Sequence, residues 1–316
     1  MKTKVPHLSI ITPTFNEEAT IEDCISQLRE FMSANMVGVK YEHIVIDNAS
    51  SDKTVEIVER FALSDLRIKL IVNSRNIGAP QNILRGLTFA SGNAAIPMLP
   101  ADLQDPIHII RDFVMKWNEG YKIVYGQRLN RQESFHWRLA RRIYYKVISS
   151  LSHFETPQNA GDFMLIDRIV IDSVNSYPKQ DLYLRGFVSR LQQPSTFVGY
   201  TWVARQAGKS KSSLLILIDT ALSGLINTSR LPARLAVGLG AITAGFSFLY
   251  GIITILLVLF GNLTAPSGVP TLVVLITFIG GIQLIFLGII GEYILGIFSH
   301  LKPDPGVSSV KLINLD

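Results

Sequence analysis

One long stretch of the chain contains no charged side chain. Between Leu235 and Gly291 there is no Asp, Glu, Lys, Arg or His. The whole chain of 316 residues is 48% hydrophobic and 17% charged, with a mean hydropathy of +0.29, so its apolar residues are concentrated rather than evenly spread. This pattern excludes an intrinsically disordered chain and a wholly soluble protein. A disulfide scaffold is excluded too, because Cys24 is the only cysteine.

Turn-forming residues from Gly261 to Pro270 divide the uncharged stretch into two apolar segments, 235–260 and 271–298. A helix needs about 20 apolar residues to cross the hydrocarbon core of a membrane, and each segment is longer than that. The sequence therefore predicts two transmembrane helices at 235–260 and 271–298, joined by an extracytoplasmic loop at 261–270 and followed by a cytoplasmic tail at 299–316. Small residues in both segments permit close helix packing, and hence a homo-oligomer.

The flanks of these two segments predict their orientation. Basic residues precede the first segment and follow the second, whereas the connecting loop has none: Lys209, Lys211, Arg230, Arg234 and Lys302. Because positively charged loops stay on the cytoplasmic side, we expect an integral membrane protein whose residues 1–211 form a cytoplasmic domain. An apolar stripe within 212–234 predicts an interfacial amphipathic helix and linker, although a helix packed on the preceding domain would show the same stripe.

Short β-rich runs alternate with helical patterns in the first part of the chain. The expected strands are 8–12, 41–46, 68–72, 94–99 and 122–125. The expected helices lie near 18–31, from 52 onward, at 80–89 and at 107–117. This alternation predicts an α/β fold with a Rossmann-like, mostly parallel sheet. Ligands of such sheets bind beyond the carboxyl ends of the strands.

Acids, amides and small turn residues follow each expected strand. The segments are Pro13–Glu17, Asp47–Asp52, Arg75–Gly78, Ala101–Pro106 and Gly126–Arg128. Each alone fits a capped turn as well as a ligand site, but five in succession favour a site for a nucleoside and a divalent cation, since oxygen ligands suit Mg²⁺ or Mn²⁺. A dehydrogenase and a P-loop NTPase are disfavoured because their glycine-rich phosphate motifs are missing from the sequence.

Basic residues cluster between Arg128 and Lys146, where Glu133 is the only acid. Aromatic residues are interleaved with them. A solvated helix face and a nucleic-acid-binding surface would both use these ingredients. The neighbouring apolar segments favour the surface of an anionic membrane instead, where each basic residue contributes around 1 kcal/mol. We therefore expect membrane lipids, and no nucleic acid, as a partner.

Four motifs carry a family resemblance. They are Pro13-Thr14-Phe15-Asn16-Glu17, Asp102-Leu103-Gln104-Asp105-Pro106, Ala160-Gly161-Asp162-Phe163 and Arg205-Gln206-Ala207-Gly208-Lys209-Ser210-Lys211. With the two apolar segments, they resemble the inverting family 2 glycosyltransferases of the A-type fold, and within them the polyprenyl-phosphate branch that includes the dolichyl-phosphate mannose synthases. The resemblance implies transfer of a sugar from a UDP- or GDP-linked donor to undecaprenyl or dolichyl phosphate, with Mg²⁺ or Mn²⁺. It implies the cytoplasmic face of a bacterial inner membrane and a lipid-linked monosaccharide for cell-envelope glycans.

The same resemblance implies roles for single residues. The donor nucleotide would be held by Pro13, Glu17, Asp47, Asn76 and Asp102. The metal on the diphosphate would be held by Asp102 and Gln104. A metal there neutralises charge that develops on the leaving nucleotide.

The lipid phosphate would be received by Arg128, Arg131, Ser134, Arg205 and Lys211. Arginine side chains suit this role because they fork onto phosphate oxygens. Catalysis would rest on Asp102, Arg131 and Asp162, with Asp162 as an orienting or weakly basic acid. A strong base is not required, since the acceptor phosphate is already an anion, with a second pKa of about 6. The alternative for Asp162 is a structural role, either capping the helix after Asp167 or forming a buried salt bridge.

Four positions depart from the family pattern: Asn48, Asn93, Pro100 and Met164. Pro100 stands where relatives carry the first acid of Asp-Xaa-Asp, and Asn48 replaces the second acid of an Asp-Asp pair. Losing a carboxylate weakens metal affinity or alters donor choice. Two alternatives therefore stay open: a catalytically degenerate membrane partner that binds nucleotide or lipid phosphate, and a glycosyltransferase with a non-lipid acceptor. The sugar is not predicted, because hydroxyl discrimination depends on pocket geometry.

Overall fold

The computed structural model describes residues 7–129, 160–177, 182–201, 268–301 and 307–315, with a few single positions between 242 and 260. Two compact units divide the chain, one formed by Met1–Ser212 with Pro303–Asp316 and the other by Ser213–Lys302. The predicted interfacial segment 212–234, the loop 261–267 and most of 235–260 lie outside the described residues.

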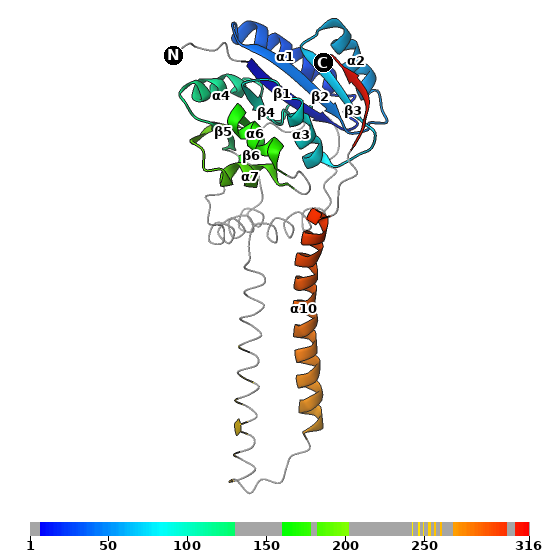
Figure 1. The fold of residues 1–316 in the computed structure, drawn as a ribbon, viewed down its shortest axis with the longest axis vertical. Coiled ribbons are helices and arrows are strands. Elements are labelled where there is room, and N and C mark those ends of the chain that lie inside the picture. The colour runs from blue at the N-terminus through cyan, green and yellow to red at the C-terminus, as the bar shows by residue number, and fades with distance from the viewer. Residues whose placement is uncertain are drawn as a thin grey trace. The chain divides into compact units, whose positions relative to one another are not determined.

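The first unit is built on one sheet whose described strands follow the order β7-β5-β6-β4-β1-β2-β3-β8 (Figure 1). The strands are β1 His7–Thr14, β2 Lys40–Asp47, β3 Ile68–Asn73, β4 Ala94–Ile96, β5 Ile123–Arg128, β6 Ala160–Asp167, β7 Ser195–Tyr200 and β8 Ser309–Ile313. The pairs β1–β2, β1–β4, β2–β3 and β5–β7 are parallel. β6 and β8 run antiparallel to their neighbours. The predicted α/β fold with a mostly parallel sheet is confirmed.

Helices cover both faces of this sheet. They are α1 Ile21–Asn35, α2 Thr54–Ser64, α3 Ala79–Thr88, α4 Ile109–Asn118, α6 Arg168–Ser176 and α7 Leu184–Arg190. The alternation of β1 explains the two layers: buried Leu8 and Ile10 join one core with α1, α2 and α4, whereas Ile11 joins a second core with α3, α6 and α7. Each fully buried side chain of this kind contributes about 1.5–3 kcal/mol to folding.

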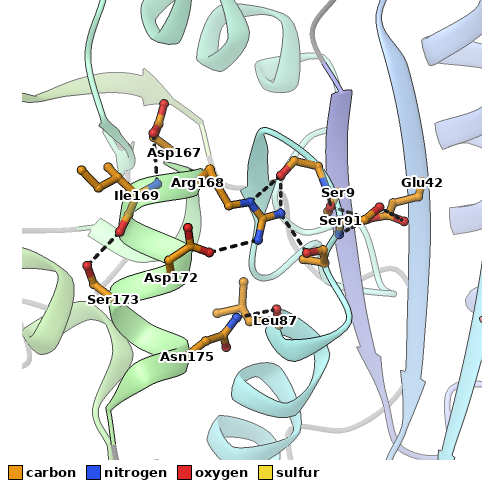
Figure 2. A network of polar contacts seen from close by, with 12 residues as sticks. Ser9, Glu42, Leu87, Ser91, Asp167, Arg168, Ile169, Asp172, Ser173 and Asn175 are labelled. Carbon is orange, nitrogen blue, oxygen red and sulfur yellow. Dashed lines mark hydrogen bonds and ion pairs between the residues drawn. The ribbon is translucent and has the colours of Figure 1, made fainter.

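The junction between β6 and α6 is held by charged side chains (Figure 2). Asp167 caps α6 by accepting from the backbone N–H of Ile169 at 3.2 Å, and it also accepts from Trp117 Nε1 at 2.7 Å. Arg168 Nε donates to the carbonyl of Gly92 at 2.9 Å. These bonds fix one end of β6 and exclude the capping role considered for Asp162, since Asp167 is the cap.

Further along the same network, Glu42 is a buried carboxylate (Figure 2). It accepts from Ser9 Oγ at 2.5 Å and from the backbone N–H of Ser91 at 2.7 Å, and Lys69 Nζ lies 2.8 Å away. Burial alone would raise the pKa of Glu42, but these donors together hold it below its ordinary value. The network ties β1 and β2 to the turn before β4.

The last strand belongs to the first unit although it follows the second in the sequence. β8 pairs with β3 and is drawn in red beside it in Figure 1. Lys311 Nζ lies 2.5 Å from Glu59 Oε1, and Asn314 Nδ2 donates to the carbonyls of Ala62 at 2.7 Å and Ile68 at 2.8 Å. The expected tail at 299–316 therefore contains an edge strand of the sheet.

The described part of the second unit consists mainly of helix α10, Val269–Leu301, which spans 33 residues. It includes the whole of the predicted segment 271–298. Large apolar side chains along it are exposed, among them Leu272, Ile276, Leu284, Leu287 and Ile297. Among the residues that the structure describes, no helix is both long enough and apolar enough to span a membrane. The two predicted transmembrane helices are thus not shown by the structure.

Candidate active site

The parallel strands end at a common edge, where their loops adopt unusual backbone conformations. Four residues in these loops have positive φ angles: Asn16 at 55°, Ala49 at 63°, Gly78 at 82° and Leu103 at 54°. Three of the four are not glycine, and a non-glycine residue pays a conformational cost in this region. Such cost persists where the surrounding contacts hold the backbone in place, as they commonly do at functional sites.

Asp47 holds the first two of these loops together. Its Oδ1 accepts from Thr14 Oγ1 at 3.0 Å and from Ser50 Oγ at 2.5 Å, and its Oδ2 accepts from the backbone N–H of Ser50 at 2.8 Å. Ser50 Oγ in turn accepts from the N–H of Asn16 at 2.8 Å. The structure thus brings Asp47 to the predicted edge, but buries it as the support of both loops.

The predicted donor residues of the first loop lie at the same edge. Pro13 belongs to β1 and is partly exposed. Glu17 is also partly exposed, and its backbone N–H donates to Thr54 Oγ1 of α2 at 2.8 Å. Thr20 Oγ1 donates to Glu17 Oε2 at 3.3 Å. This loop is therefore anchored to the start of α2.

Side-chain amides join the loop after β2 to the loop after β3. Asn48 Oδ1 accepts from the backbone N–H of Ile77 at 2.9 Å, and Asn48 Nδ2 donates to Asn76 Oδ1 at 2.8 Å. Asn76 Oδ1 accepts a second bond, from the N–H of Gly78, at 2.8 Å. Asn76, a predicted donor residue, is exposed, whereas Asn48 is 3% exposed.

The amide network continues into the sheet. Asn73 Nδ2 donates to Asn82 Oδ1 at 2.8 Å and more weakly to Asn48 Oδ1 at 3.4 Å. Asn82 Nδ2 donates to the carbonyl of Ile46 at 2.9 Å. Within the described residues, Asn73 Oδ1 is buried without a hydrogen-bond partner. Of this group, only Asn76 is predicted from the sequence as a site residue.

Asp102 and Gln104 occupy the loop that follows β4. Both are partly exposed, and the N–H of Gln104 donates to Asp102 Oδ1 at 3.3 Å. In the described ranges, no three His, Cys, Asp or Glu side chains gather into a metal-binding group. One carboxylate and one amide oxygen nevertheless fit Mg²⁺ or Mn²⁺, because such ions commonly complete their shell with water and substrate phosphates. The chemistry of the donor set therefore fits the predicted metal.

Asp105, Arg128 and Tyr200 form a buried cluster beside this loop. Arg128 Nη2 donates to Asp105 Oδ1 and Oδ2, each at 3.0 Å, and Tyr200 Oη donates to Asp105 Oδ1 at 2.5 Å. Burial alone would lower the pKa of Arg128, but the Asp105 carboxylate raises it. Arg128, a predicted phosphate ligand, thus has part of its guanidinium bound by protein. Asp105 was missed as a site residue, although it lies in the motif with Asp102.

Asp162 lies in β6, close to Arg128. A methyl group added at Gly161 would sit 3.5 Å from Arg128 Nη2, so the guanidinium lies against this part of the strand. Burial raises the pKa of Asp162, and the charges of Arg185 and Arg128 oppose that rise. A raised pKa makes a carboxylate more basic, as the predicted role requires.

Arg185 is a further cation of this region that sequence analysis missed. It belongs to α7, its Nε donates to Tyr183 Oη at 2.6 Å, and its guanidinium lies 5.2 Å from the centre of the Tyr183 ring. The sequence Tyr-Leu-Arg-Gly offers only a weak signal for such a role, because an arginine in a short helix is usually solvated. The other predicted phosphate ligands lie outside the described residues: Arg131, Ser134, Arg205 and Lys211.

Two solved structures resemble this fold at low identity. Glucosyl-3-phosphoglycerate synthase from Mycobacterium tuberculosis, solved with Mn²⁺ and UDP-glucose, is 19% identical with a TM-score of 0.49, covering 69% of this chain and 76% of that one. The mannosyltransferase PcManGT from Pyrobaculum calidifontis, solved with GDP-Man and Mn²⁺, is 16% identical with a TM-score of 0.47, covering 92% and 88%.

Comparisons of sequence extend over nearly the whole chain. The SfII prophage-derived bactoprenol glucosyl transferase of Shigella flexneri is 35% identical over 302 residues, which cover 94% of this chain and 96% of that protein. The uncharacterized glycosyltransferase YkcC of Bacillus subtilis (strain 168) is 35% identical over 298 residues, covering 94% and 91%. The model of glycosyl transferase family 2 matches residues 9–174, more than half of the chain. The chain therefore belongs to glycosyl transferase family 2, and the protein is a glycosyltransferase.

Proposed function

We propose that this glycosyltransferase moves a sugar from a nucleotide-linked donor to polyprenyl phosphate, undecaprenyl or dolichyl, with inversion at the anomeric carbon. The observation that carries the proposal is the extent of the likeness to the Shigella flexneri relative, whose name states glucosyl transfer to bactoprenol. The alignment covers 94% of this chain, so it includes the apolar C-terminal stretch as well as the strand-end loops. The product is a lipid-linked monosaccharide for use in cell-envelope glycans.

The donor lies, in this proposal, against the loops after β1, β2, β3 and β4. Glu17 and Asn76 are accessible there, and Asp47 supports the loops from beneath. Asp102 and Gln104 would hold Mg²⁺ or Mn²⁺ on the diphosphate. When bound, the metal neutralises negative charge on the departing nucleotide. Pro100 in place of an acid leaves the site with fewer protein ligands, so we expect the diphosphate to supply much of the metal affinity.

The transfer is a single displacement. An oxygen of the acceptor phosphate bonds to the anomeric carbon while the bond from that carbon to the nucleoside diphosphate breaks, so the configuration inverts. Asp162, with its raised pKa, orients the acceptor or sugar and offers a weakly basic oxygen. Arg128 and Arg185 supply positive charge near Asp162, where two anionic substrates would meet. Arg131, Ser134, Arg205 and Lys211 are proposed to bind the lipid phosphate.

We further propose that the protein is integral to the membrane, with residues 1–211 in the cytoplasm. The support comes from the sequence, because much of the region is outside the described residues. Charge is missing from Leu235 to Gly291, and basic residues flank that stretch. The exposed apolar side chains of α10 suit a lipid environment better than water.

Transfer by the purified full-length chain tests the proposal. It is incubated in detergent with undecaprenyl phosphate, Mg²⁺ or Mn²⁺ and a panel of nucleotide sugars, and glycolipid is measured. We expect one donor to give product. If no donor gives glycolipid although nucleotide binding is intact, the proposal of a lipid acceptor is contradicted. If the acceptor is not a lipid, Arg131→Ala and Arg205→Ala will leave turnover of the true acceptor nearly unchanged.

Asp102→Asn tests the proposed metal site. The substitution keeps the shape of the side chain but removes its charge, so we expect turnover to fall about tenfold or more and the metal concentration at half-maximal rate to rise. Asp172→Asn is the matched control, because Asp172 is an exposed acid on α6. Metal dependence that is the same in Asp102→Asn and in the unsubstituted protein would contradict the assignment.

A further inference from the structure

The amide groups of the loops after β2 and β3 have a fixed polarity. A backbone N–H can only donate, so the bonds from the N–H of Ile77 to Asn48 and from the N–H of Gly78 to Asn76 each identify the oxygen of the side-chain amide. Asn48 Nδ2 must then be the atom that faces Asn76 Oδ1, at 2.8 Å. The direction of every bond between these two loops follows from the backbone.

Asn73 and Asn82 reinforce this polarity from inside the sheet. The carbonyl of Ile46 can only accept, which identifies Asn82 Nδ2 and leaves Asn82 Oδ1 facing Asn73 Nδ2. If the Asn73 amide were turned over, its oxygen would face the oxygens of Asn48 and Asn82, and three acceptors would meet with no donor between them. The Asn73 oxygen instead stays buried and without a partner among the described residues. Asn48 is therefore held in one orientation from two sides.

The consequence for Asn76 is that its oxygen is already used. Asn76 Oδ1 accepts from Asn48 and from Gly78, and no described residue accepts from Asn76 Nδ2. The residue is exposed at the carboxyl edge of the sheet, one loop away from Asp47. A ligand that meets Asn76 there finds hydrogen-bond donors and no acceptor.

We infer that Asn48 is a positioning residue that turns the N–H groups of Asn76 outward, so that the donor site selects nucleotides whose base presents a carbonyl oxygen to the loop after β3. This inference rests on the proposed nucleotide-sugar function. Uracil and guanine carry such an oxygen at the edge where cytosine and adenine carry an amino group. An amino group facing the Asn76 N–H groups leaves donors on both sides unpaired, and unpaired donors lower affinity.

Nucleotide binding by the full-length chain tests this inference directly. Dissociation constants of UDP, CDP, GDP and ADP are measured with Mg²⁺ present in every case. UDP and CDP share the ribose, the diphosphate and the pyrimidine ring, so their ratio isolates the base edge. We expect UDP to bind about tenfold or more tightly than CDP, or GDP to exceed ADP by as much if the site holds a purine.

Two substitutions change the group that Asn76 presents. Asn76→Asp removes the N–H groups while its oxygens still accept from Asn48 and Gly78. Asn48→Asp replaces the donor to Asn76 Oδ1 with an acceptor, so the Asn76 N–H groups are drawn toward the new carboxylate and away from the ligand, at the cost of the bond from Gly78. Both are expected to cut the UDP-to-CDP or GDP-to-ADP preference about tenfold. The ratio is the readout because added negative charge weakens all four nucleotides alike.

Asn175→Asp serves as the matched control. Asn175 Nδ2 donates to the carbonyl of Leu87 at 3.2 Å (Figure 2), near the opposite end of α3 from Gly78. It also loses an amide donor and gains a charge, and its base preference is expected to equal that of the unsubstituted chain. Because Asn76 is exposed, Asn76→Asp keeps the test decisive even if Asn48→Asp fails to fold.

The outcomes separate the inference from the function on which it rests. Equal affinity for the two members of each pair, or a preference unchanged by Asn76→Asp, overturns the inference while nucleotide binding stands. Failure of all four nucleotides to bind overturns the proposed function itself. A preference lost in Asn76→Asp and in a folded Asn48→Asp, but kept in Asn175→Asp, supports the inference.

Discussion

Asp105 is a carboxylate with no exposed surface, so protein partners rather than water must compensate its negative charge. Arg128 and Tyr200 are those partners, and they come from the ends of β5 and β7. Breaking a buried pair by removing one partner commonly costs about 3–5 kcal/mol. The pair therefore stabilises the position of Arg128 next to Asp162, where the proposed reaction takes place.

Tyr200→Phe tests the weight of this cluster without removing a charge. The ring contact between Tyr200 and Phe163, 5.7 Å between centres, is kept. Asp105 loses a short hydrogen bond, so we expect the free energy of unfolding to fall by about 1–3 kcal/mol in a denaturant titration. Tyr177→Phe removes a hydroxyl from an exposed tyrosine and is the control. Equal stability of the two variants would refute the role of Tyr200.

His43 predicts a dependence of stability on pH. It is buried and lies 2.8 Å from Thr12 Oγ1, and burial lowers its pKa to about 4, against a weak opposing effect of Asp65. The unfolded chain binds this proton near pH 6.5. Because the unfolded state then binds more protons, stability present above pH 6.5 is lost as the pH falls toward 4.

The size of this loss is on the order of 3 kcal/mol. Denaturant titrations at several pH values measure it, with His43→Gln as the comparison. The His43→Gln chain is expected to lose that part of the slope between pH 6.5 and 4. An identical slope in both chains would show that other groups cause it.

At the scale of elements, periodicity and turn chemistry identified the strands that carry the predicted donor loops. Strands β1 to β5 appear where apolar runs lie between turn residues, because both faces of the sheet are buried. Contacts between distant residues were not predictable in the same way. The Asp105 cluster joins residues 105, 128 and 200, and β8 has only five residues, so neither leaves a periodic pattern in the sequence.

Asn314→Gly measures how strongly the end of β8 is attached. Asn314 has a φ of 60°, which glycine adopts without strain, so the substitution removes only the bonds to Ala62 and Ile68. We expect the free energy of unfolding to fall by about 1–3 kcal/mol. Asn314→Ala also adds backbone strain, so its free energy of unfolding should fall further than that of Asn314→Gly. If both variants match the unsubstituted chain in denaturant titrations, β8 contributes nothing through this residue.

At the scale of the whole molecule, charge is divided unevenly along the chain. The net charge is +5, and only two lysines follow Arg234. The basic excess therefore belongs to the part that contains the catalytic fold. This distribution suits a protein held at an anionic membrane by two forces, one apolar and one electrostatic.

Two experiments remove the apolar and the electrostatic contributions to membrane binding one at a time. The full chain is expected to stay with phosphatidylglycerol-containing vesicles in 1 M salt, because apolar insertion is not screened. A chain lacking 235–298 should bind the same vesicles at low salt and leave them as salt rises beyond the range of electrostatic attraction. Vesicle flotation measures the bound fraction of each of the two chains. Release of the full chain by salt would contradict membrane insertion.

The pairing of β8 with β3 also sets an order of events during protein synthesis. The ribosome completes β3 long before β8, because the paired residues Val72 and Lys311 are separated by most of the chain. At about 5–20 residues per second, the edge of β3 waits roughly ten to fifty seconds for its partner. Throughout that interval an open strand edge is available for pairing with other chains. A ribosome that stalls within the apolar stretch would therefore leave the catalytic fold with an open edge, because β8 is not yet synthesised at that point.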